Sequence, residues 1–431
     1  MHYLRTLSAF VVLTVNLGVN TVFAIELGAS AAQSVEVTDN AHSTDDNKAS
    51  EAISTTTLTT NLSHRSSELD MSFNYALDHV RYQKDRFDDT NTVVGQGSVT
   101  WYMVPGRVEW FVSDVESYSI VDRRQADSPD NRAQSSSLST GPKVIVALSP
   151  VDSAILDAIY TKSTTDNDSK SKSFVNSGSV GWTHLLSETK QFAIKYTQSK
   201  TDFDDNGNNF KTNTVTGTLD ANTASGSFVV GIGRTRLDRD SGDSTDSNSF
   251  DIQYVKNWLT SALSISAKKE LTDTVSAFNL SGTQANSIFS QSLELEDSVI
   301  LSTLEVSYNS PIFGALTTLG VSGSFQEEEF QTLNDVQRIK GLEVDLSHRL
   351  TQYISLSITY DYQRVQFDSV ETKRIDREHT LSLGSDYNMS KELKLSVNLS
   401  GNLRKIGREQ SIDLVDIEKN SLIFSASYQF L

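Results

Sequence analysis

The chain has 431 residues, no cysteine and a formal net charge of −18. The absence of cysteine excludes disulfides, thiolate metal sites and a cysteine nucleophile, and the acidic balance argues against a nucleic-acid partner. A hydrophobic content of 37% and a mean hydropathy of −0.33 are too polar for a bundle of membrane helices. They suit a membrane β-barrel, in which only alternate residues face lipid.

The first 24 residues have the pattern of a secretory signal peptide. One charge, Arg5, precedes a mostly apolar run over residues 7–23, and the run ends at Ala24 in a small-x-Ala pattern. A transmembrane anchor is the alternative, but Asn16 and Asn20 interrupt the run and no basic stop-transfer cluster follows. We therefore predict cleavage after residue 24.

Residues 25–67 are rich in Ser, Thr, Ala and Asp and show little periodicity apart from a possible strand near Ile53–Leu62. This composition predicts a disordered periplasmic tail, with a partial plug inside a barrel as the alternative. The predicted barrel then covers residues 68–431.

From Leu69 onward, apolar and polar residues alternate in one run after another. Examples begin at Leu69, Leu342, Ile354 and Leu393. Each run is about ten residues long, the length that a tilted strand needs to cross a bilayer. A soluble β-sandwich also alternates, but it has no need of a strand at the very end of the chain. The pattern therefore predicts an all-β fold, a transmembrane antiparallel up-and-down β-barrel.

Short turns recur at a regular interval along this region. They are predicted near Gly106, Pro150, Ser187, Ala221, Thr260, Pro311, Thr351 and Met389. With an opening and a closing strand, these hairpins predict about 18 strands, and about 16 is the alternative because residues 271–297 are ambiguous. An even number places both chain ends on the periplasmic side.

The four tryptophans all lie beside predicted short turns, at Trp101, Trp110, Trp182 and Trp258. Indole rings favour the membrane interface because the ring is apolar and its N–H needs a polar partner. We interpret them as an aromatic girdle at the periplasmic interface.

The last strand, residues 420–431, is predicted to close the ring of strands. Alternation assigns Phe424, Tyr428 and Phe430 to the lipid face and Gln429 to the lumen. Many barrels end on an aromatic residue, whereas this chain ends on Leu431, one position after Phe430. We expect the outer-membrane insertion machinery to recognise this closing strand.

A family resemblance rests on three stretches. These are Val99–Trp110 (VTWYMVPGRVEW), Asp130–Arg132 (DNR) and Gly141–Pro142 (GP). They resemble segments of the PEP-CTERM-system-associated outer-membrane β-barrel family, akin to the β-barrel porin 2 group. The resemblance covers about Leu69–Leu431. It implies an outer-membrane barrel associated with exopolysaccharide export, and it transfers no catalytic residue.

One acidic loop matches the beginning of a calcium-binding loop. Asp202, Asp204 and Asn206 occupy the first three ligand positions, and Gly207 occupies the turn position. Asn213 stands where a bidentate Glu is needed, so a solvated acidic loop is the favoured interpretation. Weak divalent-ion bridging to lipopolysaccharide is the alternative.

The predicted inward face of the last third of the barrel is acidic. Its candidate pore-lining residues are Glu343, Asp345, Arg349, Asp361, Glu378, Asp386, Glu392 and Lys394. Carboxylates in a pore wall favour cations, so a cation preference is expected. The alternative is that basic residues on other strands, such as Lys195 and Lys268, neutralise these acids.

No catalytic triad, metal motif or phosphate loop is present in the sequence, so we predict neither an enzyme nor a cofactor. Two functions remain. The first is a porin-like channel in the bacterial outer membrane, associated with exopolysaccharide export. The second is a non-conducting structural or accessory component of an envelope polysaccharide system. The expected partners are outer-membrane lipid, lipopolysaccharide, the insertion machinery, and polysaccharide or its export apparatus.

Overall fold

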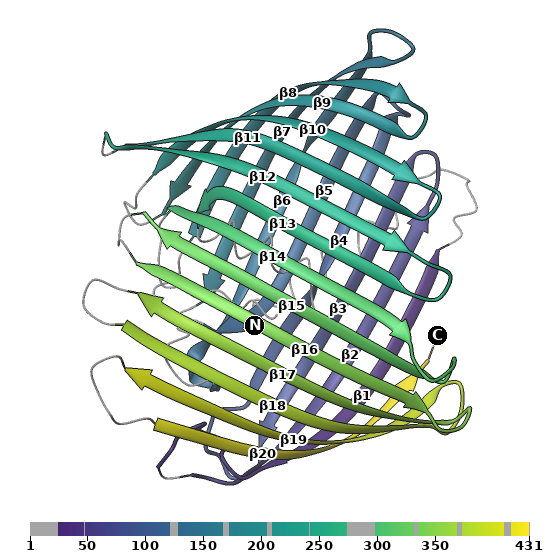
Figure 1. Cartoon of the computed structure of the whole chain (residues 1–431), viewed down its shortest axis with the longest axis vertical. Helices are drawn as coiled ribbons and strands as arrows, with labels where there is room; N and C mark the ends of the chain where they lie inside the picture. The colour runs from purple at the N-terminus through teal and green to yellow at the C-terminus, as the bar shows by residue number, and fades with distance from the viewer. Residues whose placement is uncertain are drawn as a thin grey trace, which may run out of the picture.

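One closed wall of β-strands makes up almost all of the described structure (Figure 1). The computed structural model describes residues 25–46, 48–120, 128–166, 172–204, 209–240, 242–273, 298–331, 335–368, 373–408 and 415–430. Within these ranges, twenty antiparallel strands each pair with the next strand in sequence, and the last pairs with the first. The predicted fold class, an antiparallel barrel, is therefore confirmed.

The strands are 12 to 16 residues long. They are β1 (Glu26–Thr38), β2 (Glu51–Arg65), β3 (Leu69–Tyr82), β4 (Thr90–Val104), β5 (Val108–Ile120), β6 (Arg132–Ala147), β7 (Asp152–Asp166), β8 (Lys172–Ser187), β9 (Lys190–Phe203), β10 (Phe210–Thr223), β11 (Gly226–Arg239), β12 (Ser244–Asn257), β13 (Ala262–Asp273), β14 (Ser298–Pro311), β15 (Thr317–Phe330), β16 (Val336–Arg349), β17 (Ile354–Asp368), β18 (Lys373–Asn388), β19 (Leu393–Arg408) and β20 (Val415–Gln429). One 3₁₀ turn is found in the described ranges, η1 (Pro129–Asn131), which precedes β6.

The predicted number of strands is wrong because the N-terminal segment belongs to the wall. The region from β3 to β20 holds the predicted 18 strands, and β1 and β2 add two more. Residues 25–67 are therefore neither a disordered tail nor a plug over most of their length. Their outward face carries small and polar residues such as Ala31, Gln33 and Thr56, so the alternation that marks the other strands is weak there. The predicted signal peptide, residues 1–24, lies outside the described residues.

All eight predicted short turns join the strand pairs that were expected, from β4–β5 to β18–β19. In Figure 1, the strands of the front wall from β14 to β19 meet in these turns at the right. The opposite ends carry the longer connections, such as residues 39–50 between β1 and β2. We call the two ends of the barrel the turn end and the loop end. Short turns face the periplasm and longer loops face outward in this class of barrel.

Facing residues on neighbouring strands share one side of the wall, so the register fixes which residues point outward. The outward column of β20 runs through Leu422, Phe424, Ala426 and Tyr428, and the inward column through Ser421, Ser425 and Ser427. The outward face elsewhere exposes a band of large apolar side chains. They include Leu77, Val180, Ile194, Val215, Ile232, Leu304, Leu342, Ile358, Leu383, Val397 and Phe424.

The lumen differs between its two ends. At the loop end, inward side chains are buried on almost every strand, among them Ser135, Thr201, Leu237, Ile339 and Phe367. An apolar cluster joins Phe203, Phe210 and Leu237, on the inward face, with Leu271 and Ile300, which share the outward column of Leu304. Nearer the turn end, inward residues such as Asp345 and Asp361 are only partly buried. The lumen is therefore packed toward the loop end and open to solvent toward the turn end.

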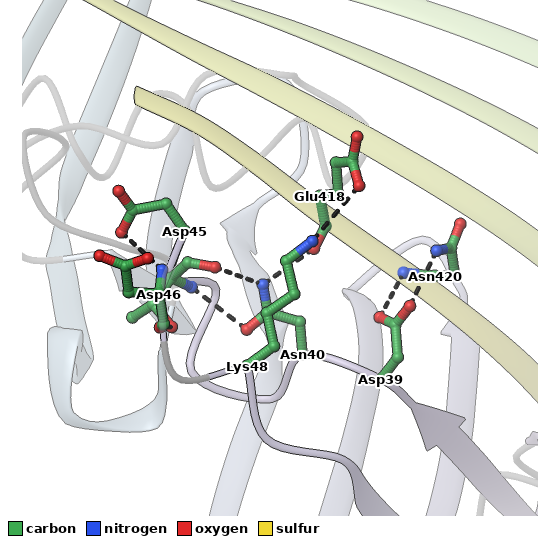
Figure 2. A network of polar contacts seen from close by, with 8 residues as sticks. Asp39, Asn40, Asp45, Asp46, Lys48, Glu418 and Asn420 are labelled. Carbon is green, nitrogen blue, oxygen red and sulfur yellow. Dashed lines mark hydrogen bonds and ion pairs between the residues drawn. The ribbon is translucent and has the colours of Figure 1, made fainter. Parts of the chain in front are cut away.

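The wall closes between β1 and β20, over Ser30–Thr38 and Ser421–Gln429. A loop extends this seam beyond the last pair at the loop end (Figure 2). The backbone amide and the side-chain amide of Asn420 each donate a hydrogen bond of 2.8 Å to the Asp39 carboxylate. Asn40 donates to the Glu418 carbonyl at 2.8 Å, and Lys48 pairs with the Glu418 carboxylate at 3.3 Å. These contacts fasten the loop after β1 onto β20.

We expect Asp39→Ala to loosen the seam and lower the stability of the folded barrel. The substitution removes two hydrogen bonds to Asn420, and each such bond contributes about 1 kcal/mol net. The measurement is the urea midpoint of the heat-modifiable folded band. The matched control is Asp45→Ala in the same loop, because among the described residues the Asp45 side chain accepts only from the Asp46 amide. Equal midpoints for both variants would contradict the role of Asp39.

Low pH should also loosen the seam and lower the stability of the wild-type barrel. Burial raises the pKa of Asp39, but the hydrogen bonds from Asn420 and the charge of Lys48 outweigh it, so the pKa lies below its usual value. A lowered pKa means that ionised Asp39 stabilises the seam above the unfolded pKa. This contribution is lost as the pH falls through the folded pKa. Asp39→Ala should therefore be less acid-sensitive than the wild type.

Candidate functional site

Four carboxylates gather on the inward face of three adjacent strands. Glu343 and Asp345 lie on β16, Asp361 on β17 and Glu378 on β18. Glu343 is directly opposite Asp361 in the ladder, and like charges in this position repel each other. Asp345 and Glu378 are the diagonal neighbours of Asp361 on its two flanking strands. We call these four residues the acid cluster.

Hydroxyl and amide groups donate hydrogen bonds to three residues of the acid cluster, while Arg404, directly opposite Glu378 on β19, pairs with Asp376. Thr359 donates to Asp345 at 2.9 Å, and Ser322 donates to Glu343 at 3.4 Å. The Asn402 side chain donates to Glu378. Among the described residues, no Lys or Arg forms an ion pair with any of the four carboxylates. Glu343 and Asp361 therefore face the solvent-accessible part of the lumen without an ion-pairing base among the described residues.

The bases that could have neutralised the cluster are paired elsewhere. Lys195 pairs with Asp157 at 3.2 Å, and Lys268 pairs with Glu270 at 2.8 Å. Two predicted pore-lining residues also pair with each other, since Lys394 lies 3.0 Å from Asp386 near the turn end. Arg349 lies at the turn end of β16, on the inward side of the ladder.

One predicted pore-lining residue is misplaced. Glu392 lies in the turn between β18 and β19, where its carboxylate accepts from Ser390 at 2.8 Å. Simple alternation extended the strand through the turn, whereas β19 begins only at Leu393. Glu392 is thus outside the wall, and the lumen is lined by the other seven predicted residues.

The candidate calcium loop does not bring its ligands together in the described residues. Asp202 lies within β9 and pairs with Lys200 at 2.6 Å, and Asp204 pairs with Lys172 at 3.0 Å. Asn206 lies outside the described residues. In the part of the chain that the structure describes, no group of three or more His, Cys, Asp or Glu residues could hold a metal ion.

The tryptophans share one rim of the barrel. Trp101, Trp110 and Trp182 lie on the outward face near the turn end, and Trp258 lies in the turn after β12. All four indoles are exposed. The Trp110 N–H donates to Thr140 and the Trp182 N–H to Asp152, at 3.0 and 3.2 Å. Exposed rings with bonded N–H groups are the arrangement expected at a membrane interface.

The inward ion pairs on β5 to β9 were not predicted from the sequence. Lys143 pairs with Glu109 at 3.2 Å, and Lys195 pairs with Asp157. Their strands carry apolar residues on the inward face as well, such as Ile155 and Ile159 on β7. Sequence alternation is therefore ambiguous in β7, and the only usable signal was the spacing of the Asp and Lys residues on neighbouring strands.

An exposed apolar exterior around a closed wall and a polar interior defines an outer-membrane β-barrel. Closure pairs the backbone groups of every strand, which lipid requires, and the apolar band faces the lipid. The protein is accordingly located in the bacterial outer membrane. No helix among the described residues is long and apolar enough to cross a membrane.

No protein-family model and no curated protein matches the chain. Solved structures with a similar arrangement include the FrpB iron transporter from Neisseria meningitidis, with 8% identity and a TM-score of 0.44 over 94% of this chain and 81% of that one. A mutant ferric enterobactin receptor (PfeA) from Pseudomonas aeruginosa has 9% identity and a TM-score of 0.46, over 93% of this chain and 80% of that one. The siderophore receptor PiuA from Acinetobacter baumannii has 10% identity and a TM-score of 0.45, over 94% of this chain and 82% of that one. The likeness concerns only the barrel shape.

Proposed function

We propose that this protein is a narrow outer-membrane channel that favours small hydrated cations. The acid cluster is the observation that supports this function best. Glu343 and Asp361 repel each other across the ladder, and the described residues supply no base between them. A carboxylate wall attracts cations and raises their local concentration, so a mobile cation offsets the repulsion.

The loop end supports a limit on solute size. Its inward wall on β6 and β7 consists of small hydroxyl residues that bond one another in pairs, such as Ser137 with Ser163 and Ser139 with Thr161. At the same end, Phe203, Phe210 and Leu237 are buried apolar residues on the inward face of β9 to β11. Hydroxyl groups can replace part of the hydration shell of an ion or a small sugar. We therefore expect small solutes to pass and polysaccharide chains to be excluded from the lumen.

The test is single-channel conductance of the purified barrel in planar bilayers, together with liposome swelling by sugars of increasing size. Discrete conductance steps with swelling only by the smallest sugars are expected. A conductance as large as that of a wide, open pore would contradict the packed loop end.

A second function rests on the same packed loop end. If no conductance is found, the barrel would be a non-conducting accessory component, and the resemblance to the PEP-CTERM-associated family would favour a role beside an exopolysaccharide export system. Its test is co-purification of the barrel with polysaccharide or with the export apparatus from cross-linked membranes.

A further inference from the structure

A groove runs along the lipid-facing wall from β5 to β10. Of these strands, β7 to β10 are labelled in the upper part of Figure 1. Its volume is about 650 Å³, and its lining includes Trp110, Pro142, Ala158, Gly178, Lys200 and Lys211. The groove does not involve the acid cluster, so a ligand could occupy it whether or not the barrel conducts.

The floor of the groove follows from one row of the ladder. Trp110 is opposite Pro142 on β5 and β6, Ala158, Gly178 and Gln198 are opposite one another on β7 to β9, and all five point outward. Three small side chains in the middle of this row leave a depression between bulkier neighbours such as Trp110 and Tyr160. A Cβ added at Gly178 would meet no atom within 4 Å. The depression is apolar and lies where lipid chains contact the wall.

The upper end of the groove is basic. Lys200 on β9 and Lys211 on β10 are directly opposite each other on the outward face. Lys200 has an ion pair with Asp202, at 2.6 Å, but Lys211 forms none with the described residues. The acid opposite Lys211, Asp238, is paired with Arg236 at 2.9 Å. Two facing cations destabilise a ladder unless an anion lies between them.

The two lysines mark the edge of the apolar band. Nearer the turn end the outward side chains are apolar, with Ile194 on β9 and Val215 on β10, and nearer the loop end they are charged. Lys200 and Lys211 lie close to the loop end of their strands, at the depth of the outer-leaflet head groups. The groove descends from this level into the hydrocarbon layer.

We propose that this groove binds a phosphorylated, acylated glycolipid of the lipid A type from the outer leaflet. A phosphate would lie between Lys200 and Lys211, and an acyl chain would lie over Ala158 and Gly178 toward Trp110. Phosphate supplies an anion for Lys211, which forms no ion pair with the described residues, and the apolar floor supplies the contact that free phosphate lacks. The position of the lysines at the loop end favours this lipid over phospholipids of the periplasmic leaflet.

The test is native mass spectrometry of the full-length barrel in detergent, titrated with purified lipid A. Lys200→Gln/Lys211→Gln should weaken binding about thirtyfold, since each lysine near a charged membrane surface contributes about fivefold. Gly178→Phe should fill the groove and abolish most binding. The matched control is Gly323→Phe, because Gly323 also faces outward on β15 and its Cβ would meet no atom within 4 Å.

The remaining probes distinguish the possible ligands. Dephosphorylated lipid A should bind weakly, and neither inorganic phosphate nor phosphatidylglycerol should compete with lipid A. Competition by either compound at similar concentrations would overturn the proposal. So would unchanged binding by the double lysine variant, which keeps the packing of the wall and so stays informative if Gly178→Phe does not fold.

Discussion

Phe424→Arg should abolish or strongly reduce the folded barrel, whereas Ser425→Arg should be tolerated. Phe424 is half exposed on the outward face of β20, between Val35 and Val397 on the neighbouring strands. A charged arginine on this face costs about 2–4 kcal/mol near the bilayer midplane. Ser425 points into the lumen between Ser34 and Ser396, where water can solvate the guanidinium.

The measurement is the yield of the heat-modifiable band after folding into lipid vesicles, with urea midpoints for the barrels that fold. Because the two substitutions are neighbours in one strand, they share any effect on insertion kinetics or strand propensity. Only the side of the wall differs. Equal loss at both positions would mean that β20 is shifted by one residue from the register described.

Neutralising the acid cluster should weaken cation selectivity without destabilising the wall. Glu343→Gln/Asp361→Asn removes two facing charges, and a like-charged pair in this position costs about 0.2–1 kcal/mol. We therefore expect the urea midpoint to stay the same or rise. The ratio of cation to anion permeability, measured as a reversal potential in a salt gradient, should fall toward one.

The matched control for this variant is Glu392→Gln. It removes one acid from the same region of the chain, but its side chain lies in the turn after β18. The reversal potential of this control should equal that of the wild type. A double variant with unchanged selectivity would show that the acid cluster does not control permeation.

Strand positions were predictable from sequence where large apolar residues alternate with polar ones. This condition holds in β3, β16, β17, β19 and β20, and the turns between strands carry recognisable residues such as Pro105 and Gly106. It fails in β1 and β2, where the outward positions include Ala29, Ala31 and Gln33. The hydrophobic contrast that identifies a lipid-facing column is too small there, so β1 was missed and β2 was predicted only as a possible strand near Ile53–Leu62.

The facing of most acids in the lumen was predictable, but their partners were not. Alternation within β16 and β17 places Glu343 and Asp361 on the inner side. Whether Lys195 pairs with Asp157 or with the acid cluster depends on the register across many strands. A single strand pattern contains no information about that register. The lipid-facing groove was hidden for the same reason, since Ala158 and Gly178 become neighbours only through the ladder.

The lumen depends on the pairing of β1 with β20, because a sheet encloses an interior only when its two edge strands pair. The structure pairs Ser34 with Ser425, and Gln33 with Ala426, across the seam. The natural chain has no cysteine, so introduced pairs can be cross-linked without background. Directly opposite residues in a ladder lie close to the separation that a disulfide or a short bifunctional thiol reagent can bridge.

The most direct measurement is therefore thiol cross-linking of the folded barrel, with Ser34→Cys/Ser425→Cys and Gln33→Cys/Ala426→Cys as two independent seam pairs. At least one pair should cross-link in high yield and change the mobility of the unfolded chain on a non-reducing gel. Ser72→Cys/Ser425→Cys, which would join β3 directly to β20, should not cross-link. Efficient cross-linking of this last pair, with none at the seam, would contradict the twenty-stranded barrel and restore a ring of 18 strands closed by β3.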